Sequence, residues 1–252
     1  IMVNTIQEAL EVAKSEKTKI WWERYMKHKI PFRGVPMSGI RECVHRVYET
    51  VSEYDVERNE SVALELLRQR FAEDKLAGII LLQEIHLKHE IEVERLFDSI
   101  FQLFESGYIY EWNTCDWMCL KVLHRLVMKS PEKYSRNRLR WIDGKSLWTK
   151  RASMIAFIPQ LKNAEIYYND FTHDLMLNVL HAFNENERFM QTAIGWTLRE
   201  LWLNNPMLVE QFIEQNISKF TSEGLRYSIE KMPEPVRNRF IDMKNNKTAF
   251  RK

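Results

Sequence analysis

The chain has 252 residues, of which 45% are hydrophobic and 29% charged, and its formal net charge is +2. This balance is typical of a globular protein with a buried core, and it excludes a polycation that binds nucleic acid through overall charge. Nucleic-acid binding would therefore require a basic face on an otherwise balanced surface.

The predicted elements are all helices. Apolar residues recur at i, i+3, i+4 and i+7 almost throughout, with no alternating strand pattern, and only seven Gly and seven Pro interrupt them. In chain order the pattern predicts helices over 4–14, 17–28, 38–52, 59–70, 73–87, 91–105, 114–129, 131–141, 147–160, 168–183, 187–203, 206–217, 221–230 and 233–242. Short polar connections favour antiparallel helix pairs stacked in a row, an all-α solenoid forming a single domain over 1–252.

The cysteines and the apolar runs indicate the compartment. Cys43, Cys115 and Cys119 cannot form a disulfide framework, which favours a reducing environment. The longest apolar run, around 76–82, is too short to span a membrane, and the first residues lack a signal-peptide pattern. We therefore expect a cytoplasmic protein.

Several chemistries have no signature in the sequence. It contains no glycine-rich phosphate loop and no G-x-S-x-G turn. The closest histidines, His86 and His89, lie three residues apart in a highly charged segment, where a solvated face is a better interpretation than a metal site. We expect neither a metal nor a cofactor.

Arg151 interrupts the apolar stripe of its predicted helix. The stripe of helix 147–160 consists of Leu147, Trp148, Met154, Ile155 and Ile158, and Arg151 lies in its middle. A buried, unpaired charge costs several kcal/mol, so Arg151 requires an anionic partner. That partner is either a carboxylate of this chain or a phosphate brought by a ligand.

Trp196 lies on the polar side of helix 187–203, opposite the apolar stripe. It shares that face with Thr192 and Arg199, and Arg188 lies nearby. A Trp on a basic face suggests that a flat or cationic group packs on it. The alternative is a contact with a neighbouring helix.

The start of helix 114–129 has two interpretations. Asn113 could cap the helix, Asp116 could favour its dipole, and Trp112 and Trp117 could form a hydrophobic staple. Alternatively, Asp116 heads the face that carries Cys119 and therefore points toward the packed side.

Asp116, Arg151 and Trp196 are 35 and 45 residues apart, about one helix pair each, so a stack of helix pairs would place them on one face. A run of positive charge leads to Arg151, and its appearance beside an exposed Trp suggests a surface that follows phosphates. The run consists of Lys133, Arg136, Arg138, Arg140, Lys145, Lys150 and Arg151, against Glu132 and Asp143.

At these residues the sequence resembles the AlkD family of DNA alkylation repair enzymes, over nearly the whole chain. The most specific match is F-M-Q-T-A-I-G-W-T-L-R over 189–199. Weaker matches, in the right order, are F-R-G-V over 32–35, A-L-E-L-L over 63–67, Trp112-x3-Asp116 and L-W-T-K-R over 147–151. Thr192 departs from the family, where a basic residue is common, and Ser38 stands where a Pro is common.

The resemblance implies a superhelix of HEAT-like repeats, an ARM-repeat-type superfold, whose concave basic face holds duplex DNA. It implies hydrolysis of the N-glycosidic bond of cationic alkylpurines, such as 3-methyladenine and 7-methylguanine, without a base-flipping pocket. Carried over by motif, Asp116 is the catalytic carboxylate, Trp112 and Trp196 are its aromatic walls, and Arg151 holds the phosphate beside the lesion. Further DNA-binding residues would be Arg199, Lys150, Arg188 and Trp148.

Two other functions are compatible with the same residues. A non-catalytic paralogue that binds branched or distorted DNA could retain Arg151 and the basic run without needing Asp116. A HEAT-type protein-interaction scaffold would have no reason to keep Asp116, Arg151 and Trp196 together. The expected partner is duplex DNA containing alkylated bases, bound by a monomer that would join the bacterial nucleoid when on DNA.

Overall fold

The computed structural model describes residues 2–51 and 53–249, and all regular secondary structure in these ranges is helical. The predicted all-α fold class is confirmed. The chain forms two compact units that meet in sequence between Leu123 and His124, and each is described in turn. The single domain expected from the sequence stays a prediction. Among the described residues, no helix combines the length and apolarity needed to cross a membrane.

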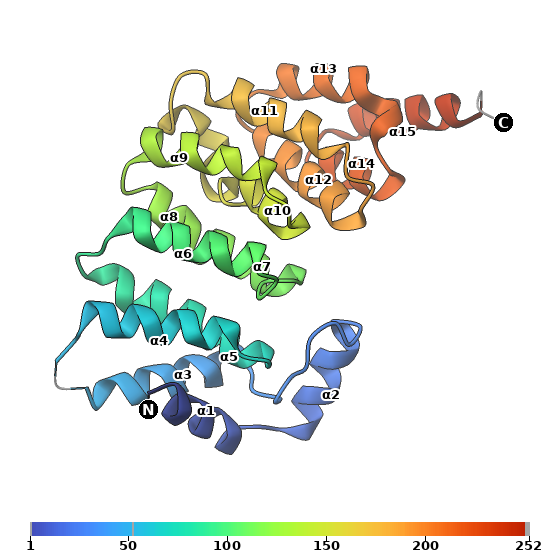
Figure 1. Ribbon diagram of the computed structural model, residues 1–252. Coiled ribbons are helices and arrows are strands. Elements are labelled where there is room, and N and C mark those ends of the chain that lie inside the picture. The colour runs from blue at the N-terminus through green and yellow to red at the C-terminus, as the bar shows by residue number, and fades with distance from the viewer. Residues whose placement is uncertain (1, 52, 250–252) are drawn as a thin grey trace. The chain divides into compact units, whose positions relative to one another are not determined.

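Unit 1 is built on a completely buried helix. Its helices are α1 (Met2–Val12), α2 (Glu16–Tyr25), α3 (Met37–Glu49), α4 (Val56–Arg68), α5 (Ala72–Ile80), α6 (Val93–Glu105) and α7 (Trp112–Met118), with the short turns η1 (Leu81–Ile85), η2 (His86–Lys88) and η3 (Cys119–Leu123). Every residue of α5 is buried, and α5 packs against α3, α4 and α7. In contrast, α2 has no buried residue and stands to one side of the stack of α1, α3, α4 and α5 (Figure 1).

Unit 2 is organised around α12. Its elements are α8 (His124–Val127), α9 (Pro131–Leu139), η4 (Arg140–Asp143), α10 (Leu147–Ile155), η5 (Ile158–Ile166), α11 (Phe171–Ala182), α12 (Arg188–Trp202), α13 (Pro206–Asn216), η6 (Ile217–Lys219), α14 (Ser222–Ile229) and α15 (Glu234–Ala249). α12 packs against α10, α11, α13 and α14 (Figure 1).

Glycine sets the distance between α12 and α14. A Cβ atom at Gly195 would lie 2.5 Å from the Cβ of Tyr227 and 2.7 Å from the carbonyl oxygen of Gly224, closer than real side chains approach. The two helices can therefore pack this tightly only because position 195 has no side chain. Trp196 follows immediately, so this contact also fixes the rotation of the helix that carries it.

Each predicted helix is present. The predicted helix 73–87 is divided into α5, η1 and η2, and two further helices differ from the prediction. The predicted helix 114–129 is divided into α7, the π-helical turn η3 and α8. The predicted helix 147–160 ends at Ile155, and the 3₁₀ segment η5 follows. Pro159 explains the last of these differences, because its ring removes a backbone N–H and clashes with the preceding turn.

Candidate functional site

Helix α7 begins with a buried carboxylate. Glu111 is its N-cap and accepts hydrogen bonds from the backbone amides of Asn113 at 2.6 Å and Thr114 at 2.8 Å. The prediction that Asn113 caps this helix is therefore wrong, since the longer Glu111 side chain reaches two amides from an extended residue. Burial raises the pKa of Glu111, and the nearby charge of Asp116 acts in the same direction.

Trp112 and Asp116 lie four residues apart on α7 and so share one side of the helix. Trp112 is half-buried and packs on an apolar cluster that includes Met26 and Phe32, and the ring centroids of Trp112 and Tyr25 are 5.8 Å apart. Asp116 is also half-buried. The pair thus combines an aromatic ring held by its neighbours with an acidic residue that is not fully buried.

A buried lysine supports the segment that leads into α7. The Nζ atom of Lys75 donates to the carbonyl oxygens of Leu67 and Tyr108, each at 2.7 Å. Burial lowers the pKa of Lys75 to about 8, with Glu111 and Asp74 acting in the opposite direction. Lys75 therefore ties the end of α4 to the residues just before Trp112.

Arg151 on α10 is buried, as its place in the apolar stripe predicts, and is only 4% exposed. Its Nη1 atom donates to the carbonyl oxygen of Phe189 at 2.6 Å and to the hydroxyl of Thr192 at 3.1 Å. Neither of these partners is anionic, and the predicted anionic partner stays a prediction. Thr192, the departure from the family pattern, is thus a contact of the arginine assigned to the phosphate.

Trp148 and Trp196, the two tryptophans of unit 2 among the predicted site residues, are both half-buried. The ring of Trp148 lies 5.3 Å from that of Phe189, centroid to centroid, so α10 and α12 join through this contact as well as through Arg151. Trp196 lies on α12 directly after Gly195, where α12 approaches α14. Its predicted role as an aromatic wall stays a prediction.

The other predicted DNA-binding cations form ion pairs within unit 2. Arg188 donates three hydrogen bonds, of 2.7 to 3.2 Å, to the carboxylate of Glu223 on α14. Lys150 pairs with Glu185, and Arg199 pairs with Glu200 and Glu230. The Lys150 and Arg199 pairs are partly buried, whereas the Arg188–Glu223 pair is exposed, and exposed pairs contribute about 0–1 kcal/mol. A phosphate could therefore replace a carboxylate such as Glu223 at small cost.

The predicted site residues thus fall into two groups. Trp112 and Asp116 lie on α7 of unit 1, whereas the other six lie on α10 and α12 of unit 2, where direct contacts join the two helices. The six residues are Trp148, Lys150, Arg151, Arg188, Trp196 and Arg199.

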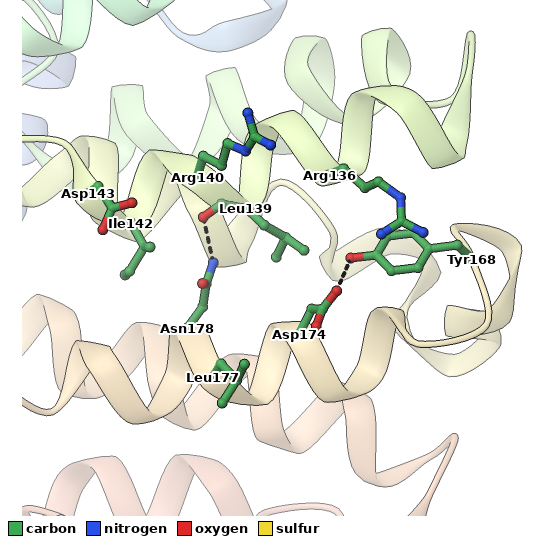
Figure 2. A pocket seen from close by; sticks show the side chains of 9 residues that line it. All are labelled: Arg136, Leu139, Arg140, Ile142, Asp143, Tyr168, Asp174, Leu177 and Asn178. Carbon is green, nitrogen blue, oxygen red and sulfur yellow. Dashed lines mark hydrogen bonds between the residues drawn. The ribbon is translucent and has the colours of Figure 1, made fainter.

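Residues of the positively charged run that leads to Arg151 make contacts in two different places. Arg136 and Arg140 line a pocket of about 320 Å³ between α9, η4 and α11 (Figure 2). There the guanidinium of Arg136 lies 3.8 Å from the ring centroid of Tyr168, whose hydroxyl donates to Asp174 at 2.8 Å. None of the predicted site residues lines this pocket, whereas Lys150 and Arg151 make their contacts with α12 and the residues just before it.

His86 is not on a solvated face, contrary to the sequence prediction. It is fully buried, with its ring nitrogens 3.0 Å from the hydroxyl of Tyr54 and 3.1 Å from the carboxylate of Glu60. The π-helical turn η1 precedes it, and the extra residue in such a turn changes the rotation of the following side chains. Among the described residues, no group of three or more His, Cys, Asp or Glu could hold a metal ion.

Two features of this region were not predicted from the sequence. Phe189 and Thr192, three residues apart on α12, are the contacts of Arg151, and only the presence of a buried cation signalled that such acceptors must exist. The ring of Tyr25 lies against Trp112, and the cluster of aromatic residues over 21–25 was the available signal.

Comparison with known proteins is consistent with this fold. The family model described as DNA alkylation repair enzyme matches residues 6–232. A solved structure titled as a predicted DNA alkylation repair enzyme from Enterococcus faecalis is similar with a TM-score of 0.71 and 18% identity, covering 88% of this chain and 97% of that chain. None of the curated proteins matches the chain. The chain belongs to the DNA alkylation repair enzyme family.

Proposed function

We propose that this chain is a DNA glycosylase that hydrolyses the N-glycosidic bond of cationic alkylated purines in duplex DNA, such as 3-methyladenine and 7-methylguanine. Family membership supports a role in DNA alkylation repair. The observation that carries the more specific proposal is the pair on α7. Asp116 lies half-buried on the same side of the helix as Trp112, and buried charges hold the start of that helix.

The chemistry requires little more than electrostatics. An alkylated purine is already cationic, so it can leave without a strong general acid. Positive charge then develops on the deoxyribose, where the carboxylate of Asp116 would stabilise it and orient the attacking water. The faces of Trp112 and Trp196 would add favourable cation–π interactions.

The residues of unit 2 would hold the DNA backbone. Arg151, which donates to Phe189 and Thr192, would bind the phosphate beside the lesion through its planar guanidinium. Lys150, Arg188 and Arg199 would exchange carboxylate partners for phosphates, and Trp148 would be a further contact.

The test is release of 7-methylguanine from methylated duplex DNA, with DNA affinity measured in the same preparation. We expect Asp116→Asn to lower the release rate about 100-fold or more, because the charge that stabilises the transition state is lost. DNA affinity should stay close to that of the wild type. Asp98→Asn, at an exposed position on α6, is the matched control and should release base normally.

Each other outcome selects a different function. Base release by Asp116→Asn at the wild-type rate would falsify the catalytic role. Tight binding by the wild type without release would indicate a paralogue that binds branched or distorted DNA. Neither binding nor release would leave a protein-interaction scaffold.

A further inference from the structure

Helix α2 presents aromatic rings to solvent. Trp21 is 57% exposed and Tyr25 is 53% exposed, although both carry large rings that folding usually buries in good part. Their rings stack on each other, with centroids 5.2 Å apart and planes 7° apart. We propose that Trp21 and Tyr25, together the α2 aromatic face, form a platform on which an unpaired nucleobase of DNA stacks.

Aromatic contacts with neighbouring residues restrict the rings of the α2 aromatic face. Trp22, the neighbour of Trp21, stacks on the buried Phe32, with centroids 5.6 Å apart and planes 12° apart. Tyr25 in turn contacts the ring of Trp112. A continuous set of aromatic contacts therefore runs from the exposed Trp21 to the tryptophan that begins α7.

The loop after α2 is bound to α5 and to the start of α2. The carboxylate of Glu73 accepts hydrogen bonds from the backbone amides of Arg33, Gly34 and Val35, at 2.9, 2.7 and 3.1 Å. At the start of α2, the amide of Ser15 donates to the carbonyl of Gly34 at 2.8 Å. These hydrogen bonds fix the loop to the buried α5 and fix the first turn of α2 to the loop.

Gly34 and Glu23 complete the attachment of α2. Gly34 has φ +102°, and a Cβ there would lie 2.1 Å from the carbonyl oxygen of Ser15, so no other residue fits. Near the end of α2, Glu23 accepts from the amide of Phe32 at 3.1 Å. The helix and its loop are therefore one clamped unit, and the aromatic face is exposed without being loosely attached.

The charges on and beside α2 indicate which kind of ligand the face binds. Lys17 and Arg24 lie on α2, and Lys27 and Lys29 follow it. All four are exposed, and none has a carboxylate partner among the residues that the structure describes. Such cations attract phosphates, whereas the exposed rings offer π faces to bases, and this combination is typical of single-stranded nucleic-acid sites. A paired base has both faces covered by its neighbours in the duplex. An unpaired base is therefore the occupant that fits.

The face adjoins the proposed catalytic residues through the Tyr25–Trp112 contact, so its placement beside a lesion rests on the proposed function. Its ability to bind an unpaired base does not require base release. The experiment therefore measures binding, and activity is scored separately.

The probe is a fluorescein-labelled duplex with one unpaired 2-aminopurine, compared with the same duplex fully paired. We expect Trp21→Leu to bind the bulged duplex about tenfold more weakly and the paired duplex within about twofold of wild type, because one base–aromatic stack is lost. The wild type should quench the 2-aminopurine fluorescence, and Trp21→Leu should not. Trp21→Phe should restore most of both signals, and Met207→Ala, an exposed apolar position in unit 2, should change neither.

Three results would overturn the proposal. They are equal losses on both duplexes, no loss on either, or dissociation of a dimer by Trp21→Leu in sedimentation velocity, which would make a second copy of the chain the occupant. Failure of the proposed function is distinguishable. A wild type that releases no 7-methylguanine but keeps the Trp21-dependent preference for the bulge would retain the platform and lose the glycosylase.

Discussion

The region around α7 and the region around α12 hold their charged groups in different ways. In unit 1, the buried side chains of Glu73, Lys75 and Glu111 each bind backbone amides or carbonyls. In unit 2, cations pair with carboxylates on or beside a neighbouring helix, as Arg188 does with Glu223. The first arrangement shapes the backbone, whereas the second leaves charged groups at the surface.

The two kinds of charged group differ in what their removal costs. Removing a buried charge leaves polar backbone groups without a partner, which costs about 1–3 kcal/mol for each. An exposed ion pair contributes about 0–1 kcal/mol and can be replaced by another anion. We therefore infer that the charges around α7 position the proposed catalytic helix, and that those around α12 are available to phosphates.

Arg151 breaks this pattern, because it is a buried cation of unit 2 bonded to a backbone carbonyl. For this reason Arg151→Ala should have the largest effect on DNA binding. It should weaken binding about tenfold and reduce the slope of log affinity against log salt by about 1, as expected for one lost phosphate contact. Binding titrations from low to high salt would measure both.

Arg151→Lys serves as its control, since it retains the charge without the planar fork of donors. It should recover most of the salt slope and only part of the affinity. An unchanged slope in Arg151→Ala would contradict the phosphate contact and leave Arg151 as a link between α10 and α12.

Glu223→Gln tests whether Arg188 exchanges a carboxylate for a phosphate, because the substitution removes the charge of the Glu223 carboxylate that Arg188 pairs with. DNA affinity should rise about twofold to threefold, with a steeper salt dependence, while the free energy of unfolding changes by less than about 1 kcal/mol. Glu214→Gln removes the same charge from an exposed residue that forms no ion pair among the described residues. Equal gains in the two variants would show only a change of net charge.

Lys75→Met should have the smallest effect on DNA affinity, whereas its effect on stability should depend clearly on pH. The pKa of Lys75 is lowered from 10.5 to about 8 in the folded protein, so between these values the unfolded chain binds more protons. The contribution of Lys75 to stability therefore rises with pH across that window and falls as pH decreases toward 8.

Urea unfolding at pH 8 and at pH 9.5 would measure this contribution in the wild type and in Lys75→Met. Tyrosines begin to ionise in this interval, but they are the same in the two proteins, so their contribution cancels in the difference. The stability difference between the two proteins should change across this interval in favour of the wild type. A constant difference would mean that Lys75 keeps an ordinary pKa.

The sequence predicted the helices because their apolar periodicity survives in the structure, and it predicted the burial of Arg151 for the same reason. It could not predict that Glu111 rather than Asn113 caps α7, because both residue types can accept hydrogen bonds from a helix start. It also could not place His86, since one extra residue in a π-helical turn leaves no mark on the hydrophobic pattern.

The candidate site shows the same limit. Helical patterns and motifs indicated Trp112, Asp116, Arg151 and Trp196, but the neighbours of these residues come from distant parts of the chain. Glu73 binds a loop about 40 residues before it, and Arg151 binds Phe189 on another helix. Contacts of this kind depend on tertiary packing, which no local window of sequence contains.

The Glu73 contacts reduce the entropy that the protein loses when a ligand binds to α2. A helix with no buried residue would ordinarily sample many orientations, and a ligand would lose binding free energy by selecting one of them. Three backbone amides that donate to one buried carboxylate restrict that sampling when the protein folds. The aromatic rings of α2 are therefore preorganised, and a partner that stacks on them meets an almost rigid surface with little entropy left to lose.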